Sequence, residues 1–189
     1  MKNELLRETA IASRRRFLLA TGGAVLSGAA VATVAGASRA YAGAAGTADV
    51  QILNTAIAAE HEAVAAYELG ATSGLLSADV AKVARAFQGH HREHVDALAA
   101  AVKSLGGSPV VAKATYTFPT DKLKAQKDVL EFAAGLERGA MSAYAGAIPL
   151  FEARELSAAA ASILADEAMH WAVLRNALGL DPVPGAFFK

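Results

Sequence analysis

The stretch EHEAVAAY at residues 60–67 returns as ERGAMSAY at residues 137–144, with the same interval between glutamate and tyrosine. A second pair follows in the same order. HREH at residues 91–94 stands against EAMH at residues 167–170, and each continues to a leucine, a glycine and a proline. The offsets of the two pairs are 77 and 76 residues. Two matches in one order at nearly one offset predict a two-helix unit that is used twice.

The composition supports a helical fold. Hydrophobic residues make up 54% of the 189-residue chain, aromatic residues only 6%, and alanine carries much of the apolar fraction. This favours helices packed through small side chains over a β-sandwich. We therefore expect an all-α protein, an antiparallel four-helix bundle with a crossover connection between its second and third helices.

Apolar residues at helical spacing set the expected helices, and glycines and prolines set their ends. Ser77 is expected to cap the second helix, Thr120 or Asp121 the third, and Pro149 should kink or end the third. Residues 106–120 lack helical periodicity and form the crossover. The helices are expected at about residues 49–71, 77–106, 121–149 and 156–179.

The repeated motifs place charged residues on the apolar faces. Glu60 shares a helical face with Leu53 and Ile57, and Glu137 and Glu167 lie equally among apolar neighbours. Buried carboxylates that face one another repel unless cations lie between them or they are protonated. A divalent metal would remove that cost. The chain has no cysteine, which argues against structural zinc and copper(I) and leaves oxygen and nitrogen ligands, which suit iron, manganese or zinc. Iron or manganese is the expected ion, with zinc as a further candidate.

These motifs resemble the ferritin-like superfamily, and in particular its twin-arginine-exported group. The resemblance covers about residues 50–180. The family scheme takes one Glu from each of two helices and Glu-x-x-His from each of the other two. By position, the resemblance implies that the single Glu ligands are Glu60 and Glu137, that Glu167 is a bridging Glu, and that His94 and His170 are the histidine ligands.

The sequence departs from this scheme at one position. His91 stands where a second bridging Glu is expected. The site then has three carboxylates and three imidazoles, which weakens the case for a symmetric carboxylate-bridged di-iron pair. A mononuclear, mixed or non-iron site stays open. His91 is either a sixth ligand or a hydrogen-bond partner of a carboxylate. His90 is the alternative to His94 as a histidine ligand.

Neighbouring polar residues receive a structural interpretation. Three polar residues lie about one helical position away from the apolar faces that carry these motifs, and we expect them on a solvated flank. They are His61, Glu62 and Glu93. Tyr67 and Tyr144 are expected in the core, with hydroxyls bonded near the ends of the bundle. The alternative for both tyrosines is contact with a ligating glutamate.

The first residues of the chain predict an export signal. SRRRFLL at residues 13–19 resembles the twin-arginine motif, and a weakly hydrophobic stretch follows it. The chain has no net charge, but residues 1–42 carry +4 and the remainder −4. We expect cleavage after Ala42, and a retained membrane anchor at residues 17–37 is the alternative. The expected domains are a signal peptide (1–42), a linker (43–48), the bundle (49–182) and a tail (183–189).

Together these features predict an exported metalloprotein, periplasmic or otherwise extracytoplasmic, with redox chemistry on dioxygen or peroxide. The alternative is a non-catalytic envelope or stress-protection protein with a structural metal or none. Iron storage in a cage is weaker, because nothing marks a cage-forming helix. The twin-arginine translocase is the expected partner, no basic stripe suggests nucleic acid, no stable membrane span is expected after cleavage, and a homodimer stays open.

Overall fold

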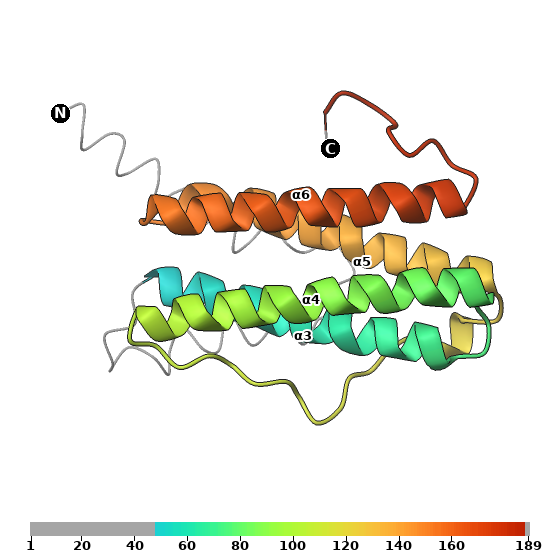
Figure 1. The fold of residues 1–189 in the computed structure, drawn as a ribbon, viewed down its shortest axis with the longest axis horizontal. Coiled ribbons are helices and arrows are strands. Elements are labelled where there is room, and N and C mark those ends of the chain that lie inside the picture. Colours follow the sequence, from blue (N-terminus) through green and yellow to red (C-terminus); the bar gives the residue numbers. More distant parts are fainter. Residues whose placement is uncertain (1–47, 188–189) are drawn as a thin grey trace.

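The computed structural model describes residues 48–187, and these form four long α-helices, two short 3₁₀ turns and no β-strand (Figure 1). The predicted all-α class and four-helix bundle are confirmed. The 3₁₀ turns are η1 (Thr120–Lys122) and η2 (Ile148–Leu150). The long helices are α3 (Ala48–Thr72), α4 (Ala78–Ser104), α5 (Gln126–Ala147) and α6 (Arg154–Ala177).

The bundle consists of two helical hairpins. Helix α3 packs against α4 and α5 packs against α6, while the hairpins meet mainly along α3 and α5 and more sparsely along α4 and α6. The connection at residues 105–119 runs along the length of the bundle, so α5 begins at the same end as α4 (Figure 1). Neighbouring helices are therefore antiparallel, and the predicted crossover is confirmed.

The two halves of the repeat end their second helices in the same way. Helix α4 is followed by Gly106 with φ +76°, and α6 is followed by Gly179 with φ +72°. Glycine adopts this left-handed conformation without steric cost, which suits it to end a helix. At the other end of α4, the backbone N–H of Val80 donates to the Ser77 hydroxyl at 3.4 Å, as the sequence predicted. Pro149 lies in η2 directly after α5, also as predicted.

The expected start of the third helix is wrong. Thr120 and Asp121 belong to η1, and α5 begins only at Gln126. The cap comes from inside the helix, because the Asp128 carboxylate accepts the backbone N–H groups of Lys124 and Ala125, each at 2.9 Å. These bonds satisfy donors that would otherwise be unpaired at the helix start.

The apolar core has two parts, one toward each end of the bundle. One cluster comprises Val50, Leu53, Ile57, Leu98, Val102, Tyr144, Ala160 and Ile163. The other comprises Tyr67, Ala84, Phe87, Leu130, Ala133 and Leu174. The buried polar residues of the repeated motifs lie between them along each helix.

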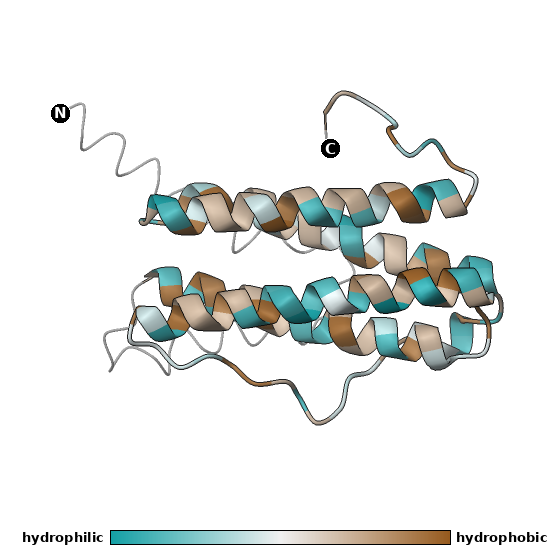
Figure 2. Cartoon of the chain, viewed as in Figure 1, coloured by the Kyte–Doolittle hydropathy of each residue, from teal (hydrophilic) through white to brown (hydrophobic). Residues whose placement is uncertain are grey.

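Hydrophobic and hydrophilic residues alternate along each helix (Figure 2). Among residues 48–187, no helix is both long and apolar enough to cross a membrane. The predicted signal peptide, its alternative as an anchor, and residues 43–47 of the predicted linker lie outside the described residues, as do residues 188–189 of the predicted tail. Those domain boundaries stay predictions.

Candidate metal centre

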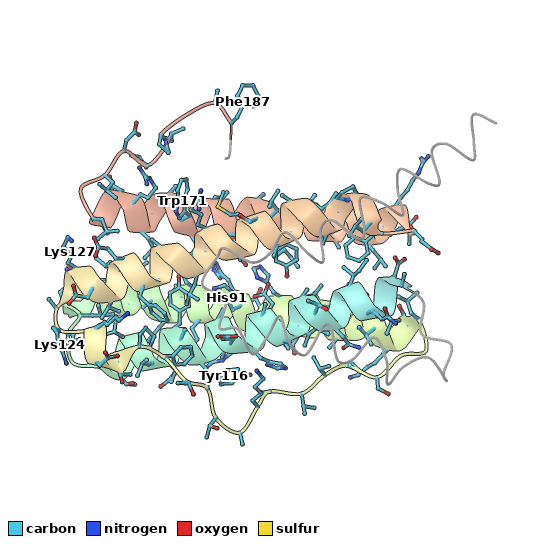
Figure 3. The ribbon with its side chains drawn as sticks, turned by 180° about the vertical axis from the view of Figure 1, so that it is seen from behind. His91, Tyr116, Lys124, Lys127, Trp171 and Phe187 are labelled. Carbon is cyan, nitrogen blue, oxygen red and sulfur yellow. The ribbon has the colours of Figure 1, made fainter. Side chains whose placement is uncertain are left out.

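All six residues predicted as metal ligands come together at the middle of the bundle. Glu60 comes from α3, Glu137 from α5, and two residues each come from α4 and α6. His94 is half-buried and the other five are buried. In the view of Figure 3, His91 lies between the two hairpins. The helical spacing explains the convergence, because residues three or four apart share one face of a helix.

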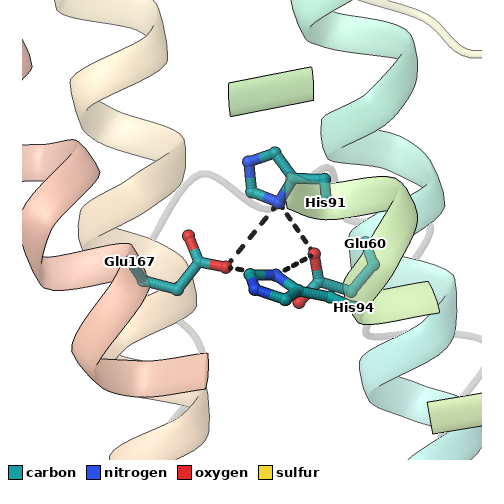
Figure 4. Close-up of side chains that lie close together, drawn as sticks. All are labelled: Glu60, His91, His94 and Glu167. Atoms are coloured by element: carbon teal, nitrogen blue, oxygen red, sulfur yellow. Dashed lines mark hydrogen bonds and ion pairs between the residues drawn. The ribbon is translucent and has the colours of Figure 1, made fainter. Parts of the chain in front are cut away.

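Four of these side chains form a first ligand group, drawn in Figure 4. Glu60 Oε2 lies 2.8 Å from His91 Nδ1 and 3.5 Å from His94 Nδ1. Glu167 Oε1 closes the group from the other hairpin, at 3.6 Å from His91 Nδ1 and 3.3 Å from His94 Nδ1. The first ligand group is Glu60, His91, His94 and Glu167.

A second ligand group lies directly beside the first. Glu137 Oε1 lies 3.4 Å from His91 Nε2 and 3.6 Å from His170 Nδ1, and Glu167 Oε2 lies 3.6 Å from the same His170 nitrogen. His91 and Glu167 therefore belong to both groups. Each residue presents one donor atom to the first group and its other donor atom to the second. The second ligand group is His91, Glu137, Glu167 and His170.

The donor atoms fit a divalent metal. Ligand atoms around an ion with tetrahedral bonds of 2.0–2.1 Å lie about 3.3 Å apart, and the separations above run from 2.8 to 3.6 Å. Within the described residues, several of these buried atoms have no hydrogen-bond partner, although buried polar atoms normally have one. They are His94 Nδ1, His170 Nδ1, Glu137 Oε2 and both carboxylate oxygens of Glu167.

Two tyrosines hold the single glutamates. The Tyr144 hydroxyl donates to Glu60 Oε1 at 2.5 Å, and the Tyr67 hydroxyl donates to Glu137 Oε1. The expectation that these hydroxyls bond near the ends of the bundle is wrong, and the alternative contact with glutamate holds. Antiparallel packing of α3 and α5 brings the tyrosine of each repeat opposite the glutamate of the other.

Burial and hydrogen bonding shift the pKa values of the cluster. Burial disfavours the charged form of His91, but hydrogen bonds to Glu137 and Glu60 outweigh it and raise its pKa to about 10. Burial also disfavours the charged forms of His94 and His170, but the neighbouring glutamates outweigh it and raise the pKa of each to about 9. Without metal, these imidazoles hold protons close to the positions an ion would take.

The three carboxyl groups respond differently. Burial and then the close approach of the Glu137 carboxyl group raise the pKa of Glu167 to about 7. For Glu60 the effect of burial is outweighed by the hydrogen bond from His91 and the close approach of His94, so its pKa falls below the usual range. Glu137 also has a lowered pKa, because the close approach of Glu167 and His170 and the hydrogen bond from His91 overcome its burial. Glu167 is therefore the carboxyl group that shares a proton most readily.

The structure also shows what the sequence interpretation missed. Asp166 Oδ2 lies 3.3 Å from His94 Nε2 and 3.2 Å from His170 Nε2, on the side opposite the ligand groups. Its position four residues before His170, on the same helical face, was the available signal. His90 lies outside both ligand groups, so it does not replace His94.

The prediction of a solvated flank holds only in part. Glu93 is exposed and His61 is half-buried, but Glu62 is buried. Helix α3 packs against both α4 and α5, so its buried surface is wider than the single apolar face that the periodicity predicted.

Comparison with known proteins agrees with this architecture. Residues 48–180, which include all four helices, match the family described as "Ferritin-like domain". A conserved hypothetical protein from Mycobacterium tuberculosis is similar in structure, with a TM-score of 0.65 and 23% identity over 75% of this chain and 97% of that one. A Dps mutant from Listeria innocua has a TM-score of 0.61 and 16% identity over 74% and 98% of the two chains. No curated protein matches the sequence.

Proposed function

Because the chain belongs to the ferritin-like domain family, we propose that it is an exported metalloprotein whose buried Glu/His cluster binds a divalent ion and performs redox chemistry on dioxygen or peroxide. Iron and manganese are the favoured ions, since the donor set combines carboxylate oxygens with imidazole nitrogens. Zinc is the further candidate.

One observation carries the metal-binding part of the proposal. Three carboxylates and three imidazoles converge from four helices, and five of their buried donor atoms have no hydrogen-bond partner among the described residues. An ion would satisfy these atoms and neutralise the carboxylates, which otherwise make burial costly.

The protein's own residues have defined tasks in this proposal. The two ligand groups hold the ion, the tyrosine hydroxyls fix the single glutamates, and the apolar clusters on either side keep water out. A bound iron or manganese ion would supply the electron transfer. In the metal-free bundle, burial and the neighbouring Glu137 raise the pKa of Glu167 to about 7, so an ion bound by this carboxylate would displace its proton near neutral pH.

Export is supported by the sequence. The twin-arginine-like stretch SRRRFLL precedes a weakly hydrophobic segment and then Ala40 and Ala42, the small residues that a signal peptidase reads. The resemblance implies passage through the twin-arginine translocase, which carries folded proteins, so a metal acquired in the cytoplasm would travel with the bundle. The periplasm or another extracytoplasmic space is the proposed location.

The experiment is elemental analysis of the full chain after expression in iron- and manganese-replete medium. We expect bound metal in the wild type, a loss of it in Glu167→Ala and His170→Ala, and retention in His61→Ala, a control at a histidine outside the cluster. Wild-type protein that is folded and metal-free, with unchanged folding of both cluster variants, would contradict the proposal.

A second candidate, a non-catalytic envelope or stress-protection protein, is favoured by the imidazole of His91 at a position where the family scheme has a carboxylate. Exposure of the metal-loaded protein to dioxygen and to peroxide separates the two. A change in its absorption spectrum supports redox chemistry, while tight metal binding with no change supports the second candidate.

A further inference from the structure

Asp166 lies among three imidazoles on the solvent side of the metal centre. Its Oδ2 atom is 3.2 Å from His170 Nε2, 3.3 Å from His94 Nε2 and 3.4 Å from His90 Nδ1. His90 Nδ1 also lies 2.8 Å from His170 Nε2, with the two rings stacked. His90 Nδ1, Asp166 Oδ2 and His170 Nε2 thus form a third compact group of donor atoms, the outer group.

The outer group differs from the two ligand groups in its access to solvent. The side chain of His90 is 44% exposed and that of Asp166 is 23% exposed, whereas His170 is 2% exposed and Glu167 is fully buried. His170 connects the two environments, because its Nε2 faces the outer group and its Nδ1 faces Glu137 and Glu167. His170 therefore contacts both the half-exposed Asp166 and the buried carboxylates, as His94 also does.

We propose that His90 and Asp166 form an outer station for divalent cations, where an ion is first held before His170 passes it to the buried ligand groups. The separations of 2.8–3.4 Å among the three donor atoms match those of ligands around a single ion. A half-exposed carboxylate beside an imidazole attracts and desolvates a cation without the cost of full burial. The inference rests on the proposed metal-binding function.

The outer station is a transient site, and the chemistry of His170 explains why. A neutral imidazole has one nitrogen that accepts a metal and one that carries a proton. His170 therefore serves the outer group through Nε2 or the second ligand group through Nδ1, but not both at once. Once the ion is inside, the Nε2–H of His170 donates to Asp166, an arrangement that orients a metal-bound histidine.

The test measures the rate of uptake separately from the amount bound. Metal-free full-length protein is mixed with Co²⁺ in a stopped-flow instrument, and the visible absorption of bound cobalt is followed in time. His90→Ala should slow uptake by about tenfold, because local charge and ligands raise association rates by this order. His90→Asp, which restores a cation ligand, should recover most of the rate, and His61→Ala should match the wild type.

The outcomes separate this inference from the proposed function. Uptake by His90→Ala at the wild-type rate overturns the outer station and leaves the buried metal site intact. Loss of the final cobalt absorption in His90→Ala also overturns it, since His90 would then be a ligand of the buried ion. If no variant binds cobalt, and the wild type does not either, the proposed function itself fails. Circular dichroism of each variant confirms that the bundle is folded.

Discussion

His91 stands where the ferritin-like scheme has a second bridging glutamate. This difference affects how many ions the cluster can hold. A bridging carboxylate offers two anionic oxygens, whereas a neutral imidazole offers one acceptor nitrogen. His91 faces Glu60 through Nδ1 and Glu137 through Nε2, so it can ligate in only one of the two groups at a time. We therefore expect one tightly held ion per chain.

This expectation is tested by restoring the carboxylate. His91→Glu should raise the metal retained after dialysis from about one to about two ions per chain, because glutamate can bridge both groups. His91→Gln is the control, since a neutral amide bridges poorly and should leave the content near one. Elemental analysis with a protein assay measures the ratio. A wild type that already retains two ions contradicts the argument.

The tyrosine–glutamate bonds give a second prediction at this scale. Tyr144→Phe keeps the ring but removes the hydroxyl that donates to Glu60 Oε1 at 2.5 Å. We expect metal affinity to fall by about 10–100-fold, as is usual when a group that orients a ligand is lost. Competition with a chelator measures it. Tyr116→Phe, on the crossover connection, is the matched control, and an equal loss there would show a general effect on folding.

Gly107, three residues after the end of α4, leaves no room for a side chain. A Cβ atom on Gly107 would lie 2.7 Å from Val50 Cγ1 and 3.2 Å from the carbonyl oxygen of Val102. Gly107→Ala should therefore lower the free energy of unfolding by about 1–3 kcal/mol, the range for overpacking. Urea denaturation followed by circular dichroism tests this.

A control glycine lies on α5. Gly135 is exposed and helical, and within the described part of the chain a Cβ atom there would meet nothing within 4 Å apart from its chain neighbours and the backbone of its own helix. Gly135→Ala should raise the free energy of unfolding by about 0.5–1 kcal/mol, because alanine favours a helix over glycine. If Gly107→Ala raises the free energy of unfolding as Gly135→Ala does, the steric argument at Gly107 is wrong.

The elements also show what a sequence allows one to predict. Helices α3, α4 and α6 begin and end near the expected residues because apolar periodicity, a serine cap and Leu-Gly ends are local signals. Helix α5 begins later because its cap, Asp128, acts backwards from inside the helix. Contacts between residues that are far apart in the sequence have no such local signal. Pairing Tyr144 with Glu60 requires the antiparallel register of α3 and α5, which only the folded chain provides.

For the whole molecule, protonation links the metal centre to stability. In the metal-free bundle the pKa of His91 is raised from 6.5 to about 10, and those of His94 and His170 to about 9. A group whose pKa is raised by folding stabilises the fold below its unfolded pKa and loses that effect as the pH rises through the folded pKa. Glu167, raised from 4.5 to about 7, acts in the same direction over its own range.

We therefore expect the Tm of chelator-treated protein to fall between pH 6.5 and pH 9.5. Metal binding displaces these protons and is stronger at higher pH, so the metal-loaded protein should lose less Tm over the same interval. Thermal unfolding followed by circular dichroism at both pH values, with and without metal, measures the difference. A metal-free Tm that rises with pH would show that the imidazoles do not stabilise the bundle through their protons.

Neither helical hairpin contains a complete ligand group. The first group needs Glu167 from the second hairpin, and the second group needs His91 from the first. A chain of half this length would assemble the centre only where two copies meet, so its metal affinity would depend on protein concentration. Joining the copies in one chain removes that dependence and lets them evolve apart. His91 and Glu167, at equivalent positions of the repeat, are an instance of that divergence.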